Sequence, residues 1–226
     1  MNKRNNHIAF IPARKGSKGF PGKNSKLFVF TANFIKKSKL FDRVIVSTND
    51  EAVKRKATIS NFEIHNRKNK YSTSTSSIKS SILSAINELN INENDIIWLF
   101  YIPIIYKDLV DFKKAKKIIS KKNVNSLLSF VKDNIHPYHF WKFDRNKKTI
   151  KQYFKNNIYR RQDLPAAFRY YHYLCCFKVK EVKNLNEELI NNKTFPLILD
   201  LKTSDKLIEV DTHIDYIKWK KFYEIK

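Results

Sequence analysis

The sequence predicts a three-layer α/β fold, in which helices cover both faces of a mostly parallel sheet. Short β-branched runs such as residues 43–48 (RVIVST) alternate along the chain with segments such as residues 78–89, whose apolar residues recur every three or four positions. Strands that alternate with helices are typical of a parallel sheet with crossover helices. A length of 226 residues suits one substantial domain with room for a small appendage.

The expected strands are compact apolar runs. A buried strand at residues 8–11 comes first, and residues 95–102 (DIIWLFYI) are the most hydrophobic segment, which suits the centre of the sheet. Further strands are expected at residues 43–48, 62–65, 126–131, 174–179 and 208–210.

The expected helices lie between these strands. Apolar spacing predicts them at residues 27–38, 78–89, 109–120, 182–191 and 214–223, with a further helix that begins near Glu51. Asn49 or Asp50 can cap that helix, because a short polar side chain accepts hydrogen bonds from the free amides of a first turn.

The alternation stops between about residues 136 and 173. Aromatic and cationic residues crowd together there in YHFWKF, KQYFKN and YRRQDLPAAFRYYHY. We expect strands and loops that leave the main sheet, and call this segment the excursion. Since no repeat or linker interrupts the rest, residues 1–226 are predicted to form a single domain that carries it.

Composition limits the class of protein. The formal charge of +24 could indicate nucleic-acid binding, yet the lysines are spread along the whole chain, which argues for a compositional bias instead. No apolar run approaches the ~20 residues that span a bilayer, and the basic start resembles no signal peptide. Adjacent Cys175 and Cys176 suit buried thiols in a reducing compartment. We therefore expect a cytoplasmic protein without a membrane partner.

All three glycines of the chain fall in one window, at Gly16, Gly19 and Gly22, directly after the first expected strand. The same loop carries cations at positions 14, 15, 18 and 23. Backbone amides in a glycine-rich loop can converge on phosphate oxygens while cations neutralise their charge. A lysine-rich surface loop is the alternative. The spacing matches neither the Walker A nor the dinucleotide fingerprint.

The string IPARKGSKGFPGKN nevertheless resembles, almost without a break over fourteen residues, the signature loop of the CMP-sialic acid synthetases (N-acylneuraminate cytidylyltransferases) and their relatives. The resemblance implies a Rossmann-like sheet and a loop that wraps CTP. It assigns catalytic roles on the phosphates to Arg14 and Lys23. The CTP contacts that it implies are Arg14, Gly16, Ser17, Lys18, Gly19, Gly22, Lys23 and Asn24.

A second stretch, HNRKNKYSTSTSSI, occupies the place where the family has an arginine and then a polar segment that opens a helix. Arg67 takes the arginine position, and Ser76 with Ser77 the small polar pair. Hydroxyl groups and free amides at a helix start suit recognition of base and ribose, whereas an ordinary helix cap is the other interpretation.

The acceptor side both matches and departs from the family. In RRQDLP, Arg161 takes the position of an arginine associated with a sugar carboxylate, and Lys142 lies near the place of a family lysine. Tyr101 stands in a segment where the family has Gln-Pro-Thr-Ser-Pro, and Lys107 falls where an arginine follows it. A family Asn-Gly is replaced at Tyr171 and His172.

The segment IEVDTHIDY resembles the family's closing motif, in which two aspartates separated by one residue end a strand. Alternation on a strand places Glu209 and Asp211 on one face, where both carboxylates could reach one Mg²⁺. Asp211 is expected as the firmer ligand, because glutamate at the first position is one methylene longer.

These features together predict an Mg²⁺-dependent cytidylyltransferase that transfers CMP from CTP to the anomeric hydroxyl of an acidic sugar, a sialic acid or related nonulosonate, and releases pyrophosphate. The resemblance also implies a homodimer, with the excursion as its contact. Three alternatives stay open: a same-fold nucleotidyltransferase with another acceptor, a degenerate relative that binds nucleotide without catalysis, and a basic nucleic-acid-binding protein.

Overall fold

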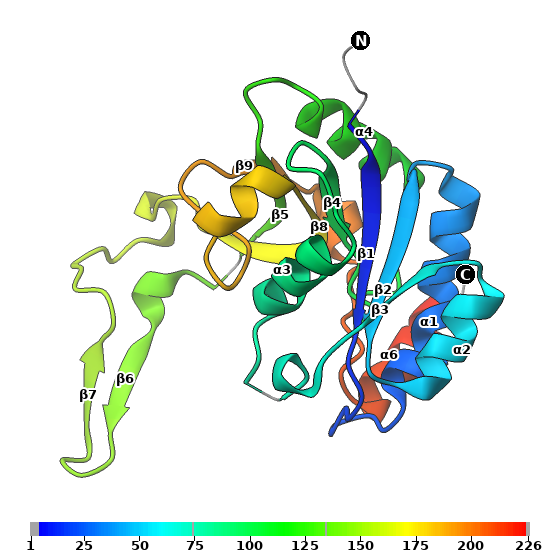
Figure 1. Ribbon diagram of the computed structural model, residues 1–226. Coiled ribbons are helices and arrows are strands. Elements are labelled where there is room, and N and C mark those ends of the chain that lie inside the picture. Colours follow the sequence, from blue (N-terminus) through cyan, green and yellow to red (C-terminus); the bar gives the residue numbers. More distant parts are fainter. Residues whose placement is uncertain (1–4, 74, 134, 225–226) are drawn as a thin grey trace.

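A seven-stranded sheet forms the centre of the protein, as seen in the computed structural model (Figure 1). The structure describes residues 5–73, 75–133 and 135–224. The order across the sheet is β3-β2-β1-β4-β8-β5-β9. The strands are β1 (His7–Ala13), β2 (Arg43–Thr48), β3 (Glu63–Asn66), β4 (Ile96–Leu99), β5 (Ser126–Lys132), β8 (Phe168–Lys178) and β9 (Phe195–Ile198).

Helices cover both faces of this sheet. Ala9 and Ile11 of β1 pack in one core with α1 (Lys23–Ser38), α2 (Glu51–Ile59) and α4 (Leu109–Ile119), and α6 (His213–Glu224) adds Tyr216 and Trp219. The alternate residues Ile8 and Phe10 belong to a second core with α3 (Ile78–Glu88). Because successive side chains of a strand point to opposite faces, these two cores confirm the expected three-layer α/β sandwich.

The sheet is mostly parallel, as expected. β1 pairs parallel with β2 and β4, β2 with β3, and β5 with β9. β8 runs antiparallel to both of its neighbours, β4 and β5. Its first residues therefore lie at the edge where the parallel strands end, which is the usual edge for ligands in open α/β sheets.

Three expectations about elements were wrong. The first helix begins at Lys23, four residues before the expected start. The helix expected at residues 182–191 is a 3₁₀ segment, η4 (Val179–Asn184), followed by a turn. Asn186 explains that turn, since its side-chain oxygen accepts hydrogen bonds from the amides of Glu188 (2.9 Å) and Ile190 (3.1 Å).

The strand expected at residues 208–210 is reduced to one isolated bridge between Ile104 and Glu209. β9 and the short helix α5 (Leu201–Ser204) were not expected from the sequence. Asp50 is the cap of α2, because its carboxylate accepts a hydrogen bond from the Ala52 amide at 2.9 Å.

The excursion leaves the sheet after β5 as an antiparallel hairpin of β6 (Trp141–Asp144) and β7 (Thr149–Gln152), which extends away from the sandwich in Figure 1. Two 3₁₀ turns flank the hairpin, η2 (Pro137–His139) and η3 (Arg161–Asp163). β8 takes over at Phe168, so the chain rejoins the sheet before the expected residue 173. The exposed hydrophobic side chains of the hairpin and its flanks include Phe140, Trp141, Phe143, Ile150, Tyr153 and Phe154.

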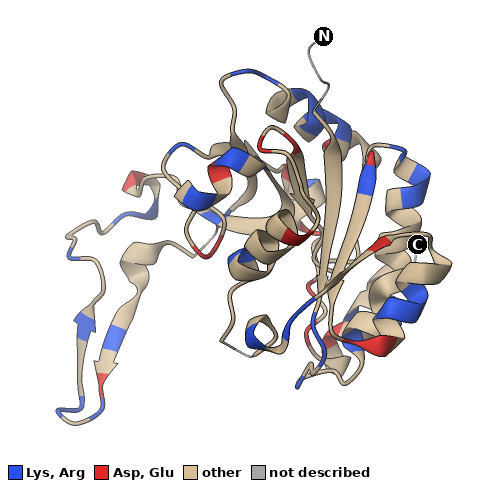
Figure 2. Ribbon diagram, viewed as in Figure 1, with Lys and Arg blue, Asp and Glu red and all other residues tan. Residues whose placement is uncertain are grey.

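Lysine and arginine are spread over helices, hairpin and loops in Figure 2. Among the residues described, no helix combines the length and apolarity that a bilayer crossing needs. Cys175 and Cys176 are both buried and unbridged, as expected.

Candidate active site

The glycine loop joins the end of β1 to the start of α1, and its conformation depends on glycine. Gly16 and Gly22 adopt φ values of +89° and +70°, a region that side chains with a Cβ disfavour. Gly19 serves a different purpose, since a Cβ at this position would lie 2.8 Å from the backbone oxygen of Asp211. Gly16 and Gly22 thus allow the conformation of the loop, and Gly19 allows its close contact with the backbone of Asp211.

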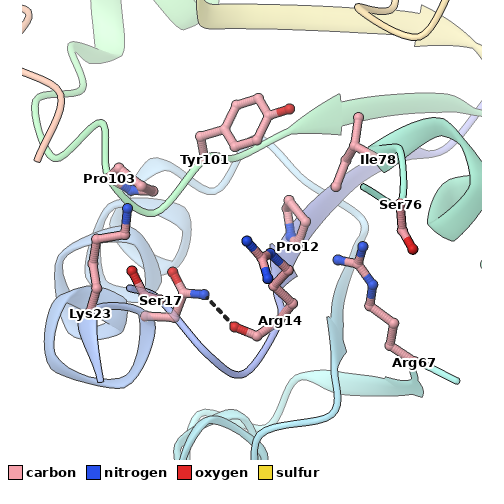
Figure 3. Close-up of a pocket in the computed structure, with 10 residues that line it drawn as sticks. Pro12, Arg14, Ser17, Lys23, Arg67, Ser76, Ile78, Tyr101 and Pro103 are labelled. Atoms are coloured by element: carbon pink, nitrogen blue, oxygen red, sulfur yellow. Dashed lines mark hydrogen bonds between the residues drawn. The ribbon is translucent and has the colours of Figure 1, made fainter. Parts of the chain in front are cut away.

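A cavity opens beside this loop at the carboxyl ends of β1 and β4. Figure 3 shows side chains from the loop, from the segment after β3 and from the segment after β4 around it. Asn24 braces the loop, because its side-chain amide donates to the Arg14 carbonyl at 2.9 Å. The lining residues are Pro12, Arg14, Ser17, Lys23, Asn24, Arg67, Ser76, Ile78, Tyr101 and Pro103.

Two guanidinium groups face this cavity together. Arg67 is only 5% exposed, and its Nε donates to the Tyr71 carbonyl at 2.7 Å. Burial, with the nearby charge of Arg14, lowers the pKa of Arg67. Within the described part of the chain, neither arginine has an ion-pair partner. Buried cations need a counter-charge, so this arrangement favours an anionic ligand.

Lys23 adds a third cation, and it is already paired. Its Nζ lies 2.5 Å from Oδ1 of Asp211, and the lysine is buried while the aspartate side chain is 61% exposed. Lys23 is the first residue of α1, where free backbone amides add positive potential. The pair therefore connects the start of α1 to the segment that carries Glu209 and Asp211.

Glu209 lies beside that pair. Burial, and the negative charge of Asp211, raise the pKa of the Glu209 carboxyl group. Two neighbouring carboxylates at an open cavity fit Mg²⁺, which proteins commonly hold through one or two carboxylates, water and substrate phosphates. Around the described residues, no group of three or more His, Cys, Asp or Glu side chains forms a complete metal cage.

A second cavity of about 540 Å³ adjoins the first, and Tyr101 lines both. We call it the acceptor chamber. Its volume falls in the range of small-molecule sites. Its lining residues are Tyr101, Ile104, Arg169, Tyr170, Tyr171, His172, Glu188 and Glu209.

Several residues predicted for the nucleotide come together as expected. Arg14, Ser17, Lys23, Asn24, Arg67 and Ser76 line the first cavity, while Gly16 and Gly22 line a smaller hollow inside the loop. Lys18 is exposed and lines neither space. Ser77 caps α3, since its hydroxyl accepts from the Ser80 amide at 3.2 Å, as the alternative interpretation held.

The residues predicted for the acceptor are scattered. Tyr101 lines the chamber, but the ammonium of Lys107 points into the interior, where it donates to the Ile104 carbonyl and to Thr31 Oγ1 at 3.3 Å. Burial lowers the pKa of Lys107 to about 7. Lys142 is exposed on β6, and Arg161 lines a separate cavity with His136 and His139. The fold of a single chain does not bring these three residues to the chamber.

Sequence reasoning missed Arg169, Glu188, Pro12 and Pro103. Arg169 stands in AAFRYYHY, where nothing in the spacing distinguishes it from neighbouring cations. Glu188 lies within the helix expected at residues 182–191, which does not form, so its position depends on the Asn186 turn.

Comparison with known proteins identifies the family of this chain. A sequence profile described as cytidylyltransferase matches residues 8–190. N-acylneuraminate cytidylyltransferases of three Streptococcus agalactiae strains are 25% identical over 221 residues, which cover 92% of this chain and 53% of each relative. The chain thus spans about half the length of these curated relatives.

Solved structures share the fold. A CMP:2-keto-3-deoxy-manno-octonic acid synthetase complexed with CTP superposes with a TM-score of 0.67 at 12% identity, covering 97% of this chain and 98% of the other. A 4-diphosphocytidyl-2C-methyl-D-erythritol synthase from Anaerococcus prevotii gives 0.65 at 13% identity, with 97% and 99% covered. Because the profile spans most of the chain, the protein belongs to the cytidylyltransferase family of nucleotidyltransferases.

Proposed function

We propose that this protein transfers CMP from CTP to the anomeric hydroxyl of an acidic sugar, a sialic acid or a related nonulosonate. The observation that supports this most is the pair of adjoining cavities. One holds Arg14, Arg67 and Lys23 beside a glycine loop, and the other opens next to it across Tyr101. A nucleotide in the first and an acceptor in the second would place the reacting groups side by side.

In the proposed reaction, the acceptor hydroxyl oxygen attacks the α-phosphorus of CTP. The bond from that phosphorus to the bridging oxygen breaks, pyrophosphate leaves, and the hydroxyl proton passes to solvent. Negative charge spreads over the phosphate oxygens, and fixed cations stabilise it. Arg14 and Lys23 are assigned to the phosphates, and Arg67 with Ser76 to the base and ribose end of the cavity.

Glu209 and Asp211 would hold Mg²⁺. The ion, when bound, would neutralise charge on the triphosphate. The second carboxylate oxygen of Asp211 could take the ion; if the ion took Oδ1 instead, which lies 2.5 Å from Lys23 Nζ, the ammonium would be free for a phosphate oxygen. If the ion displaced Lys23 from Asp211 in this way, binding of the metal and binding of the nucleotide would each favour the other.

We further propose that the protein acts as a homodimer in the cytoplasm. The hairpin and its flanks expose large apolar side chains, including Trp141 and Phe143, which a second copy would cover. Lys142 and Arg161 lie on this excursion, away from the chamber of their own chain. In a dimer they would contribute to the acceptor chamber of the other protomer.

A pyrophosphate-release assay tests the function. The protein is incubated with Mg²⁺, each of the four nucleoside triphosphates, and acceptors that include N-acetylneuraminic acid, 2-keto-3-deoxy-manno-octonic acid and 2C-methyl-D-erythritol 4-phosphate. Release with CTP and a sugar acid supports the proposal. Release with the methylerythritol phosphate alone would assign a different acceptor class, and CTP binding without release would indicate a degenerate relative. Salt-sensitive RNA binding without CTP affinity would favour the nucleic-acid alternative.

A further inference from the structure

The wall of the acceptor chamber is an irregular part of β8. Leu128 of β5 pairs with Cys175, but the next residue, Ser129, pairs with Tyr171, so residues 172–174 of β8 have no partner across the ladder. In a regular strand consecutive side chains point to opposite faces. Here four consecutive residues, 169–172, all line the chamber. Alternation is kept in this stretch, because Arg169 lies over the ring of Tyr171 and Tyr170 packs against His172; the chamber therefore contacts both faces of β8 along the edge that does not pair with β4.

Tyr173 fixes the bulge from the opposite side. It is buried, its hydroxyl accepts a hydrogen bond from the Asp108 amide at 2.9 Å, and it donates one to Asp111 Oδ2 at 2.9 Å. These bonds tie the centre of the bulge to the first turn of α4. The chamber wall is therefore held in place before any ligand binds.

One end of the chamber holds Arg169 together with the Glu209 carboxyl group, and the other end holds Glu188. Arg169 supplies the cation: its Nε donates to Asp133 Oδ2 at 3.0 Å, and its guanidinium carbon lies 5.9 Å from the centre of the Tyr171 ring. Its side chain is 58% exposed. Glu188 supplies the carboxylate near His172, whose Nε2 lies 3.0 Å from the Glu188 carbonyl oxygen.

The aromatic side chains between these ends pack on one another. The ring of His172 lies 5.2 Å from that of Tyr101 and 5.4 Å from that of Tyr170, both edge to face. Arg169 and His172 are three strand residues apart, roughly 10 Å at the ~3.3 Å rise of a strand. A ligand that spans the chamber would meet the guanidinium of Arg169 near Glu209, then the aromatic rings, and then the side chain of Glu188.

We propose that Arg169 binds the carboxylate of an acceptor that lies in the chamber of the same chain. Glu188 accepts hydrogen bonds from hydroxyl or amide N–H groups at the other end of the acceptor. This inference rests on the proposed function and names the residue that selects acids over neutral acceptors. A guanidinium presents paired N–H donors that match a carboxylate. Arg161, the residue that the sequence suggested for this role, lines a different cavity of the same chain.

The test is binding, measured by calorimetry with CTP-saturated protein in the absence of divalent metal, so that no turnover occurs. The probes are N-acetylneuraminic acid, 2-keto-3-deoxy-manno-octonic acid and the methyl ester of each. Wild-type protein should prefer an acid over its ester. Arg169→Ala should weaken acid binding by about 10- to 100-fold, the range for a lost charge-assisted hydrogen bond, and leave ester binding unchanged. Arg169→Lys should restore part of the preference.

Arg43→Ala is the matched control, since Arg43 pairs with Glu63 at 2.9 Å on the far side of the sheet. It should leave the affinities for CTP, acid and ester unchanged. Glu188→Gln should weaken acid and ester alike. The assignment of Arg169 to the carboxylate is overturned if wild-type protein binds acid and ester equally well. It is also overturned if Arg169→Ala still prefers the acid. The proposed function fails separately, if wild-type protein binds the acid and releases no pyrophosphate with Mg²⁺ present.

Discussion

Replacing Gly19 with alanine tests whether close packing of the glycine loop against the Asp211 segment is needed to position Asp211. The new Cβ would lie 2.8 Å from the backbone oxygen of Asp211, whereas ordinary contact begins at 3.4 Å. One of the two backbone segments must therefore move by about 0.6 Å, and neither is a flexible side chain. Overpacking of this kind costs ~1–3 kcal/mol, partly offset by ~0.4–1 kcal/mol from the lower entropy of the unfolded chain.

We expect Gly19→Ala to lose about 1–2 kcal/mol of unfolding free energy in urea. Its larger effect should be on turnover, since the displacement falls on Asp211, 2.5 Å from Lys23. Misplacement by 1 Å can cost ~100-fold in rate, so a loss of about 10-fold in kcat with a higher Mg²⁺ requirement is the expected result.

Gly16→Ala provides the matched comparison. A Cβ there meets nothing within 4 Å, but φ is +89°, so the variant should lose a similar ~1–2 kcal/mol from backbone strain. Its Mg²⁺ titration should match that of the wild type, because Asp211 is undisturbed. If Gly19→Ala also shows a wild-type metal titration, or full stability, the close packing of loop and closing segment does not constrain the site.

Three further variants test other parts of the site. Lys23→Ala should abolish pyrophosphate release while circular dichroism shows an intact fold, and near-normal turnover would remove Lys23 from the chemistry. Asp211→Ala should abolish the Mg²⁺ dependence of turnover, so an unchanged titration with metal would exclude it as a ligand. For Lys107, whose pKa burial lowers from 10.5 to about 7, the unfolded chain binds a proton that the folded chain releases between these values. The free energy of unfolding should therefore rise as the pH increases from about 7 to 9.5. In urea titrations, Lys107→Met should reduce the slope of this free energy against pH. A slope equal to that of wild type would contradict the burial of this ammonium.

The nucleotide side was predictable because its residues are close in sequence. Gly16, Gly22 and Lys23 belong to one loop, and a strand before it with a helix after it determines where that loop lies. Arg67 was expected from its place in a string that resembles the family, and in the structure it follows β3, which runs parallel to β2. The glycine loop came from local spacing, whereas Arg67 needed the family resemblance.

The acceptor side was not predictable by the same route. Lys107 occupies the position of a family arginine, yet the carbonyl of Ile104 and the hydroxyl of Thr31 draw its ammonium into the core. Glu188 depends on a turn made by the Asn186 side chain, which interrupts a pattern that apolar spacing alone assigns to a helix. Both outcomes come from hydrogen bonds that leave no periodic signal in the sequence.

The direction of β8 explains why the chamber lies next to the excursion. An antiparallel strand enters the sheet at the edge where the parallel strands end, so the first residues after the excursion reach the site directly. Residues 169–172 are these first residues, and the bulge after them is held by Tyr173. Substitutions in this stretch can reshape the acceptor chamber without disturbing the backbone pairing of Cys175 and Cys176 with β5, deeper in the sheet. The first cavity is formed by another strand and loop, so the proposed acceptor chamber could change while the proposed CTP contacts are retained.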